Sequence, residues 1–158
     1  MLLYLPQPDE LSLLYGGDRF RDWGVVAGAL PGRALLRQGL QNRDAGSLAY
    51  RWSVPYLIVV PGASRVVGTI GGKGLLEDEE DVEIAYNVAA PARGQGYASQ
   101  AIALLQGYAR RDALQLLAHV EPDNLPSRRL LRTAGFTFEA TFCLPDSLDL
   151  ERWRWSPD

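Results

Sequence analysis

The sequence predicts an α/β or α+β fold built on a mixed β-sheet, and two observations lead to this prediction. Between residues 82 and 135, strand and helix patterns alternate in the order strand, helix, strand, helix. This order is typical of parallel strands joined by a crossover helix. On either side of this region, strand patterns joined by short turns indicate antiparallel hairpins. A chain of 158 residues with both kinds of pairing predicts a single domain, residues 1–158, around one mixed sheet.

The first fifty residues give weaker patterns than the rest of the chain. A short strand is predicted at residues 1–5, and helical pieces are predicted at 9–15 and 34–41. Residues 55–72, PYLIVVPGASRVVGTIGG, contain two runs rich in β-branched residues around Pro-Gly-Ala-Ser. This pattern predicts a β-hairpin.

From residue 82 onward the patterns are stronger. Residues 82–88 alternate, so that Val82, Ile84, Tyr86 and Val88 share one face of a strand while Glu83, Ala85 and Asn87 share the other. Residues 97–113 predict an amphipathic helix of about four turns. The remaining elements are a strand at 114–122, a helix that begins near Pro126 and ends at Gly135, and two strands at 136–144 and 149–156.

Composition and charge exclude several classes of protein. The net charge of −3 argues against a general nucleic-acid-binding protein. One cysteine and one histidine provide neither an internal disulfide nor a Cys/His zinc site, so no metal is expected. The N-terminal residues lack the basic flank of a signal peptide, and no apolar run approaches the length of a membrane helix. We therefore expect a cytoplasmic protein that does not bind membranes.

Residues 90–99, APARGQGYAS, place two glycines between a proline and the start of the long predicted helix. The first N–H groups of a helix lack intrahelical partners and lie at the positive end of its dipole. Gly94 and Gly96 carry no side chains, so these N–H groups can approach an anion closely, and Arg93 adds a positive charge. The pattern indicates a phosphate or pyrophosphate site, and the alternative is a glycine-rich turn without a ligand.

Two common phosphate-binding patterns fit this stretch poorly. A nucleoside-triphosphate loop requires Lys-Ser or Lys-Thr after its last glycine, and neither follows here. A dinucleotide loop requires Gly-x-Gly-x-x-Gly, but Ser99 stands where the third glycine belongs. A nucleotide-binding protein is therefore the weaker alternative.

Residues 93–98, RGQGYA, resemble the Arg/Gln-x-x-Gly-x-Gly/Ala signature of the GNAT superfamily of acyl-CoA-dependent N-acyltransferases. The preceding VEIAYNV is similar to the central strand of that superfamily. The following HVEPDNLPSRRLLRTAGF is similar to its Asn-x-x-Ser/Ala…Gly-Phe segment, with Asn124, Ser127, Gly135 and Phe136 in place. The combination is closest to the branch that acetylates protein N-termini, the ribosomal-protein alanine type, and many small amines. The resemblance covers residues 55–142 and hardly extends to residues 1–50.

The resemblance implies an N-acetyltransferase that moves an acetyl group from acetyl-CoA to a primary amine by direct attack. The acceptor is a protein N-terminus or a small amine. The fold it implies is a mixed sheet of about six to seven strands, splayed at its centre and flanked by helices. The arm of the cofactor would lie in the splay and its pyrophosphate on the glycine turn. The cofactor-binding residues implied by the resemblance are Tyr86, Asn87, Val88, Ala89, Arg93, Gly94, Gln95, Gly96, Tyr97, Ala98, Ser99, Asn124, Ser127 and Leu131.

Leu131 departs from the family pattern, because many members carry a tyrosine general acid at its position. Leucine cannot donate a proton, so Ser127 or water replaces that function, or the thiolate leaves unassisted. The departure also keeps open an alternative function as a non-catalytic acyl-CoA-binding sensor module. A homodimer stays open as the assembly.

Three side chains are candidate catalytic groups, and each has a structural alternative. Glu83 is a candidate base, or a solvated carboxylate. The Ser127 hydroxyl either donates to the leaving sulfur or satisfies N–H groups at the start of a helix. His119 stands where N-terminal acetyltransferases similar to this block carry a glutamate base, and its imidazole can accept a proton at neutral pH; alternatively, it packs under a helix. By alternation, Glu83 is expected to face the same side of the sheet as His119. The choice of base between them stays open.

Overall fold

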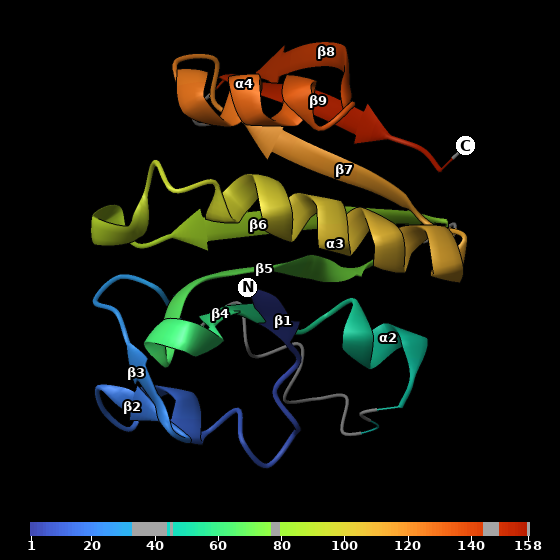
Figure 1. Cartoon of the computed structure of the whole chain (residues 1–158). Coiled ribbons are helices and arrows are strands. Elements are labelled where there is room, and N and C mark those ends of the chain that lie inside the picture. Colours follow the sequence, from blue (N-terminus) through green and yellow to red (C-terminus); the bar gives the residue numbers. More distant parts are fainter. Residues whose placement is uncertain (33–43, 45, 77–79, 144–148, 158) are drawn as a thin grey trace.

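The computed structural model describes residues 1–157 except 33–43, 45, 77–79 and 144–148 (Figure 1). The helix predicted at 34–41 lies outside the described residues. Among the residues that are described, no helix combines the length and the apolar character needed to cross a membrane.

The described strands form one mixed sheet, as predicted. Its main path runs in the order β1-β4-β5-β6-β7-β9-β8, and two short strands, β2 and β3, attach to it at β5. All neighbouring pairs along the main path are antiparallel except β6 and β7, which are parallel. The strands are β1 (Leu2–Tyr4), β2 (Arg19–Phe20), β3 (Trp23–Val25), β4 (Tyr56–Val60), β5 (Arg65–Leu75), β6 (Asp81–Val88), β7 (Gln115–Val120), β8 (Thr137–Cys143) and β9 (Asp149–Trp155).

The hairpin predicted at 55–72 is confirmed as the antiparallel pair β4 and β5. A short 3-10 turn, η3 (Pro61–Ala63), joins the two strands. The strand predicted at 1–5 is also confirmed, and it pairs with β4 as β1.

The helix predicted at 9–15 is wrong. This segment forms turns that end in a single 3-10 turn, η1 (Leu13–Tyr15). Seven residues form too short a stretch for a helix to be stable on its own. The Glu10 carboxylate instead holds the segment, because it accepts hydrogen bonds from the Tyr4 hydroxyl at 2.7 Å and the Gln7 N–H at 2.8 Å.

Both helices predicted between 97 and 135 are present. The long helix α3 (Tyr97–Asp112) connects β6 to β7, and α4 (Leu125–Thr133) connects β7 to β8. Gly135 follows α4 with a φ of +83°, the left-handed conformation in which glycine is favoured. A further short helix, α2 (Leu48–Arg51), was not predicted from the sequence, although Ser47 caps it by accepting a hydrogen bond from the Tyr50 N–H.

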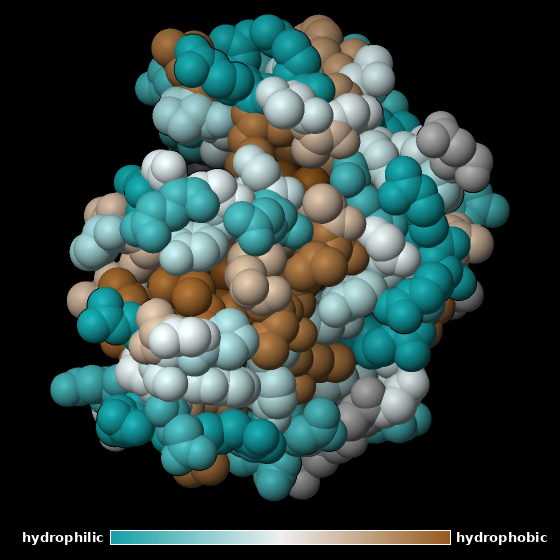
Figure 2. Space-filling model, in the orientation of Figure 1, coloured by the Kyte–Doolittle hydropathy of each residue, from teal (hydrophilic) through white to brown (hydrophobic). Residues whose placement is uncertain are grey.

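The apolar core lies on both faces of the sheet. One cluster lies between the sheet and α3 and α4, and it includes Ile84, Ile102, Leu105, Leu116 and Leu131. A second cluster packs the N-terminal segment and α2 against β4 and β5, and it includes Leu11, Leu14, Tyr50, Leu57 and Val59. Figure 2 shows apolar residues gathered over the middle of the face that carries α3, with polar residues toward its edges.

The sheet is splayed between β6 and β7. These strands pair only near their starts, through Asp81 with Gln115, Val82 with Leu116 and Glu83 with Leu117. Beyond Glu83, β6 pairs with β5 alone and β7 pairs with β9 alone. Figure 1 shows β7 running obliquely away from β6 toward α4. Among the described strands, none therefore pairs with the β7-facing edge of β6 over residues 84–88.

Candidate active site

The glycine turn lies between the end of β6 and the start of α3. Gly94 and Gly96 have φ values of +76° and +77°. A Cβ atom at either position would contact no heavy atom closer than 3.7 Å, so the turn needs glycine for its backbone conformation rather than for space. Gly96 is the N-cap of α3 and offers no side-chain oxygen to the first helical N–H groups. These groups remain available to a ligand.

Arg93 fixes the turn against β6. Its Nε donates a hydrogen bond to the Val88 carbonyl at 3.0 Å. A cleft of about 240 Å³ lies over the turn, lined by Val88, Ala92, Arg93, Gly94, Gly96, Tyr97, Ala98 and Ser99. The structure thus brings most of the predicted anion-binding residues together. Gln95 lies outside this lining, and its side-chain oxygen accepts a hydrogen bond from the Tyr97 hydroxyl at 3.1 Å.

A second cavity, of about 370 Å³, occupies the splay between β6 and the start of α4. Asn124 caps α4, because its Oδ1 accepts a hydrogen bond from the Ser127 N–H at 3.2 Å. The capping oxygen therefore belongs to Asn124, and the Ser127 hydroxyl does not take the capping role that was its alternative. The cavity is lined by Tyr86, Asn87, Val88, Arg93, Ala98, Asn124, Pro126, Ser127 and Leu130.

A third cavity, of about 270 Å³, continues from the splay to His119. Tyr86, Asn124 and Ser127 border both the second and the third cavity. Val88, Arg93 and Ala98 border both the first and the second. The three cavities therefore adjoin one another in a row, here called the channel, from the glycine turn, through the splay, to the histidine.

His119 and Glu83 meet at the inner end of this channel, so the prediction that they share one side of the sheet is confirmed. His119 Nδ1 lies 3.0 Å from Glu83 Oε1, and Lys73 Nζ lies 2.5 Å from the same oxygen. Burial raises the pKa of Glu83, but the hydrogen bonds from Lys73 and His119 and the positive charge of Lys73 outweigh it and leave that pKa below its ordinary value. Glu83 is therefore an ionised carboxylate, and its lowered pKa makes it a weak base. The edge of the His119 ring contacts Phe142 of β8 at a centroid distance of 5.3 Å.

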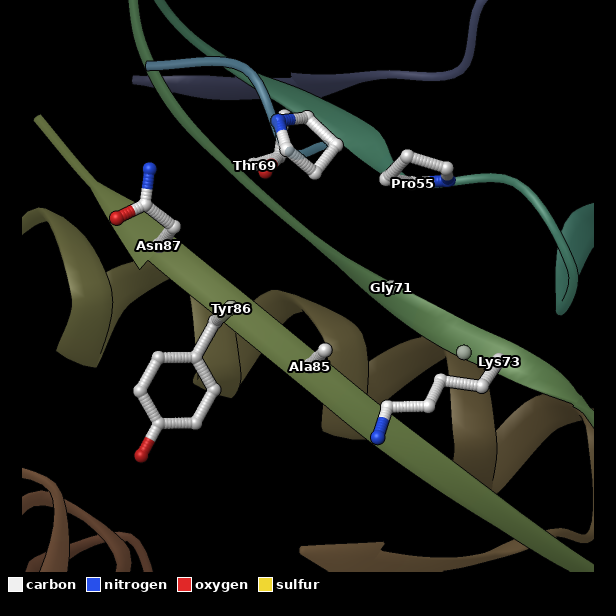
Figure 3. Close-up of a pocket in the computed structure, with 9 residues that line it drawn as sticks. Pro55, Thr69, Gly71, Lys73, Ala85, Tyr86 and Asn87 are labelled. Carbon is white, nitrogen blue, oxygen red and sulfur yellow. The ribbon is translucent and has the colours of Figure 1, made fainter. Parts of the chain in front are cut away.

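A fourth cavity, of about 80 Å³, lies between β5, β6 and the segment before β4 (Figure 3). Its lining is mainly apolar, and Lys73 stands at one end. The side chain of Asn87 belongs to this side of β6, where its Nδ2 donates to the Gly28 carbonyl at 2.6 Å. The lining residues are Pro31, Pro55, Thr69, Gly71, Gly72, Lys73, Ala85, Tyr86 and Asn87.

Besides Gln95, two of the predicted cofactor-binding residues lie away from these cavities. Leu131 is fully buried in the core beneath α4, and Ala89 is 1% exposed. The Ala89 N–H donates to the Val67 carbonyl at 2.9 Å. Both residues support the elements that line the channel rather than the channel itself.

Lys73 was missed in the sequence. The signal for it was present, because Lys73 continues the alternation of Thr69 and Gly71 along β5, but its pairing with Glu83 depends on the register of β5 against β6.

The sequence family described as "Acetyltransferase (GNAT) domain" matches residues 19–137. The chain belongs to the GNAT acetyltransferase family. Among curated relatives of this GNAT protein, the uncharacterized N-acetyltransferase p20 of Bacillus licheniformis is 31% identical over 86 residues, which make up 53% of this chain and 48% of the relative. The chain thus spans about half the length of that relative.

Two solved structures show the same fold over nearly the whole chain, and a third shows it over 61% of the chain. The CoA complex of RimL, a ribosomal-protein α-N-acetyltransferase, matches with a TM-score of 0.66 at 18% identity, covering 98% of this chain and 92% of that one. A chimera of spermidine N-acetyltransferase SpeG from Vibrio cholerae with hSSAT matches with a TM-score of 0.67 at 15% identity, covering 99% and 96%. An acetyl-CoA complex of the acetyltransferase yncA from Salmonella typhimurium matches with a TM-score of 0.53 at 25% identity, covering 61% of each chain.

Proposed function

We propose that this GNAT protein is an N-acetyltransferase that transfers an acetyl group from acetyl-CoA to a primary amine. The observation that carries the proposal is the channel from the glycine turn to the His119–Glu83 pair. Acetyl-CoA supplies the acetyl thioester. The complexes of yncA with acetyl-CoA and of RimL with CoA support this choice of donor.

The residues of the channel fit this donor. The uncapped first turn of α3 and the two left-handed glycines offer backbone N–H groups to a pyrophosphate. The β7-facing edge of β6 over residues 84–88, with which no described strand pairs, offers backbone groups to the amides of a pantetheine arm. Asn124 and Ser127 border the opposite side of the same cavity.

His119 is the general base in this proposal, and Glu83 is its positioning residue. The Glu83 carboxylate accepts from Nδ1, which assigns the Nδ1–H tautomer and leaves the lone pair of Nε2 free to accept a proton. The amine nitrogen forms a bond to the acetyl carbon, the C–S bond breaks, and Nε2 takes the proton that the amine loses. Lys73 keeps Glu83 ionised and fixes it from the other side.

The fourth cavity favours one class of acceptor. It opens on the side of β6 that carries Glu83, about 7 Å further along the strand at Ala85. Its proline, alanine and glycine walls suit a small apolar group, and none of the described residues that line it is acidic. Lys73 at its end repels an additional cation. A peptide N-terminus with a small side chain therefore fits this site better than a polyamine.

A panel of acceptors tests this proposal. Release of the CoA thiol is measured with peptides that begin with Ala, Ser or Met, and with spermidine and an aminoglycoside, at saturating acetyl-CoA. We expect the highest kcat/KM with the alanine or serine peptide. A preference for spermidine would contradict the acceptor class, and binding of acetyl-CoA without turnover on any amine would favour the sensor module. The cytoplasmic location and the homodimer stay predictions from the sequence.

A further inference from the structure

The hydroxyl of Tyr86 is buried and makes no hydrogen bond of ordinary geometry with any of the described residues. Buried hydroxyls in folded proteins are nearly always hydrogen-bonded, because an unsatisfied polar group loses its hydration without replacement. A ligand that forms a hydrogen bond with the hydroxyl would explain why the protein itself supplies none. The Tyr86 ring packs against the core, but the core forms no hydrogen bond with the Tyr86 hydroxyl.

The position of Tyr86 indicates which ligand atom forms a hydrogen bond with its hydroxyl. Figure 3 shows the ring extending from β6 away from Pro55 and β5. The residue borders both the cavity in the splay and the cavity that contains His119. Ser127 of α4 borders the same two cavities. A donor whose arm fills the splay and whose acetyl group faces His119 has its sulfur at this junction.

We propose that the Tyr86 hydroxyl donates a hydrogen bond to the sulfur of the donor as the C–S bond breaks. The inference rests on the proposed function. Tyr86 thereby supplies from β6 the donor that Leu131, buried beneath α4, cannot supply. The electron pair of the C–S bond goes to sulfur, and the hydroxyl stabilises the thiolate that leaves.

The electrostatic surroundings of Tyr86 suit a hydrogen-bond donor. Burial raises the pKa of Tyr86, and a weaker interaction with the Ser127 hydroxyl, outside ordinary hydrogen-bond geometry, lowers it by a smaller amount. The phenol therefore stays protonated at neutral pH. Since a thiolate is a weaker base than a phenolate, the proton remains largely on Tyr86 while the two groups share it. Ser127 supports the phenol rather than replacing it.

Tyr86→Phe removes only the hydroxyl. We expect kcat with acetyl-CoA to fall about 10- to 100-fold, while the Kd of CoA changes less than about threefold. An acetyl thioester of 4-nitrothiophenol, whose thiolate needs no donor, should be used equally well by both proteins. The melting temperature without ligand should hold or rise, because the variant removes an unsatisfied polar group. Tyr108→Phe, on the far end of α3, is the matched control and should behave as the wild type.

A second readout does not depend on turnover. CoA bound to the wild type should ionise its thiol at lower pH than CoA bound to Tyr86→Phe, by about one pKa unit, as followed by thiolate absorbance. If the proposed acetyl transfer fails with every amine, this titration still decides the role of Tyr86. Unchanged kcat and an unchanged thiol titration in the variant would overturn the proposal. So would an equal loss of rate with both thioesters, or a destabilised variant, because either result makes the hydroxyl structural.

Discussion

Replacing Glu83 with glutamine separates the two candidate bases. The amide keeps an oxygen that accepts from His119 Nδ1, but it removes the negative charge that lies 3.0 Å from that nitrogen. Hydrogen bonds to charged groups contribute about 1.5–3 kcal/mol and neutral ones about 0.5–1.5 kcal/mol, so the contact weakens by about 1–1.5 kcal/mol. At 1.36 kcal/mol per factor of ten, kcat should fall about five- to thirteenfold.

His119→Ala should have the larger effect, because it removes the proton acceptor itself. We expect kcat to fall about 10²–10⁴-fold. Initial rates of thiol release at saturating acetyl-CoA and alanine peptide give kcat, and calorimetry should show nearly unchanged CoA affinity in both variants. Glu139→Gln on β8, which removes a carboxylate paired with Arg152 and Arg154, is the control. If Glu83→Gln loses more activity than His119→Ala, then Glu83 is the base and the histidine is structural.

Three further predictions concern the cradle, the acceptor and acid stability. Gly96→Val should raise the Kd of CoA at least about tenfold, because a β-branched residue is strained at a φ of +77° and distorts the turn. The control is Gly107→Ala, within α3, which should leave the Kd of CoA unchanged and add about 0.5–1 kcal/mol of stability. Lys73→Met removes the cation that pairs with Glu83. The ratio of kcat/KM for spermidine to kcat/KM for the alanine peptide should rise about fivefold, because a charge interaction of about 1 kcal/mol is lost. An unchanged ratio would show that Lys73 does not select the acceptor. Burial raises the pKa of Glu10, but hydrogen bonds from Gln7, Tyr4 and Arg21 outweigh it, so the pKa in the folded state is lowered. The contribution of Glu10 to stability is therefore present above the unfolded-state pKa. It is lost as the pH falls through the folded-state pKa. Thermal unfolding from pH 7 into the acid range should therefore show a steeper loss in the wild type than in Glu10→Gln, and parallel curves would contradict the assignment.

The elements that the sequence predicted well are those with local patterns. The β4–β5 hairpin, α3 and α4 follow from alternation, periodicity and the glycines that end them. Alternation also predicted that Glu83 and His119 could lie on one side of the sheet, but it left open the register of β6 against β7 that brings them there. Their distance depended on the three-residue pairing of β6 with β7, which no local pattern contains.

The parts that the sequence did not predict depend on contacts between distant segments. The turns at 9–15 are held by Glu10, whose partner Arg21 comes from a later segment. Lys73 reaches Glu83 across a strand pair, and the Tyr86 hydroxyl stands out only because no neighbour bonds to it once the splay is formed. Tertiary geometry, not residue type, gives these groups their chemistry.

The binding of acetyl-CoA to the splayed channel is the central claim, and thermal unfolding with increasing acetyl-CoA tests it most directly. A ligand that binds only the folded state at 100 times its Kd stabilises that state by about 2.7 kcal/mol. For a chain of this size, the melting temperature should rise by about 5–10 °C and keep rising with concentration. In Gly96→Val the same rise should require far more ligand. A transition that millimolar acetyl-CoA leaves unmoved in the wild type would contradict the account.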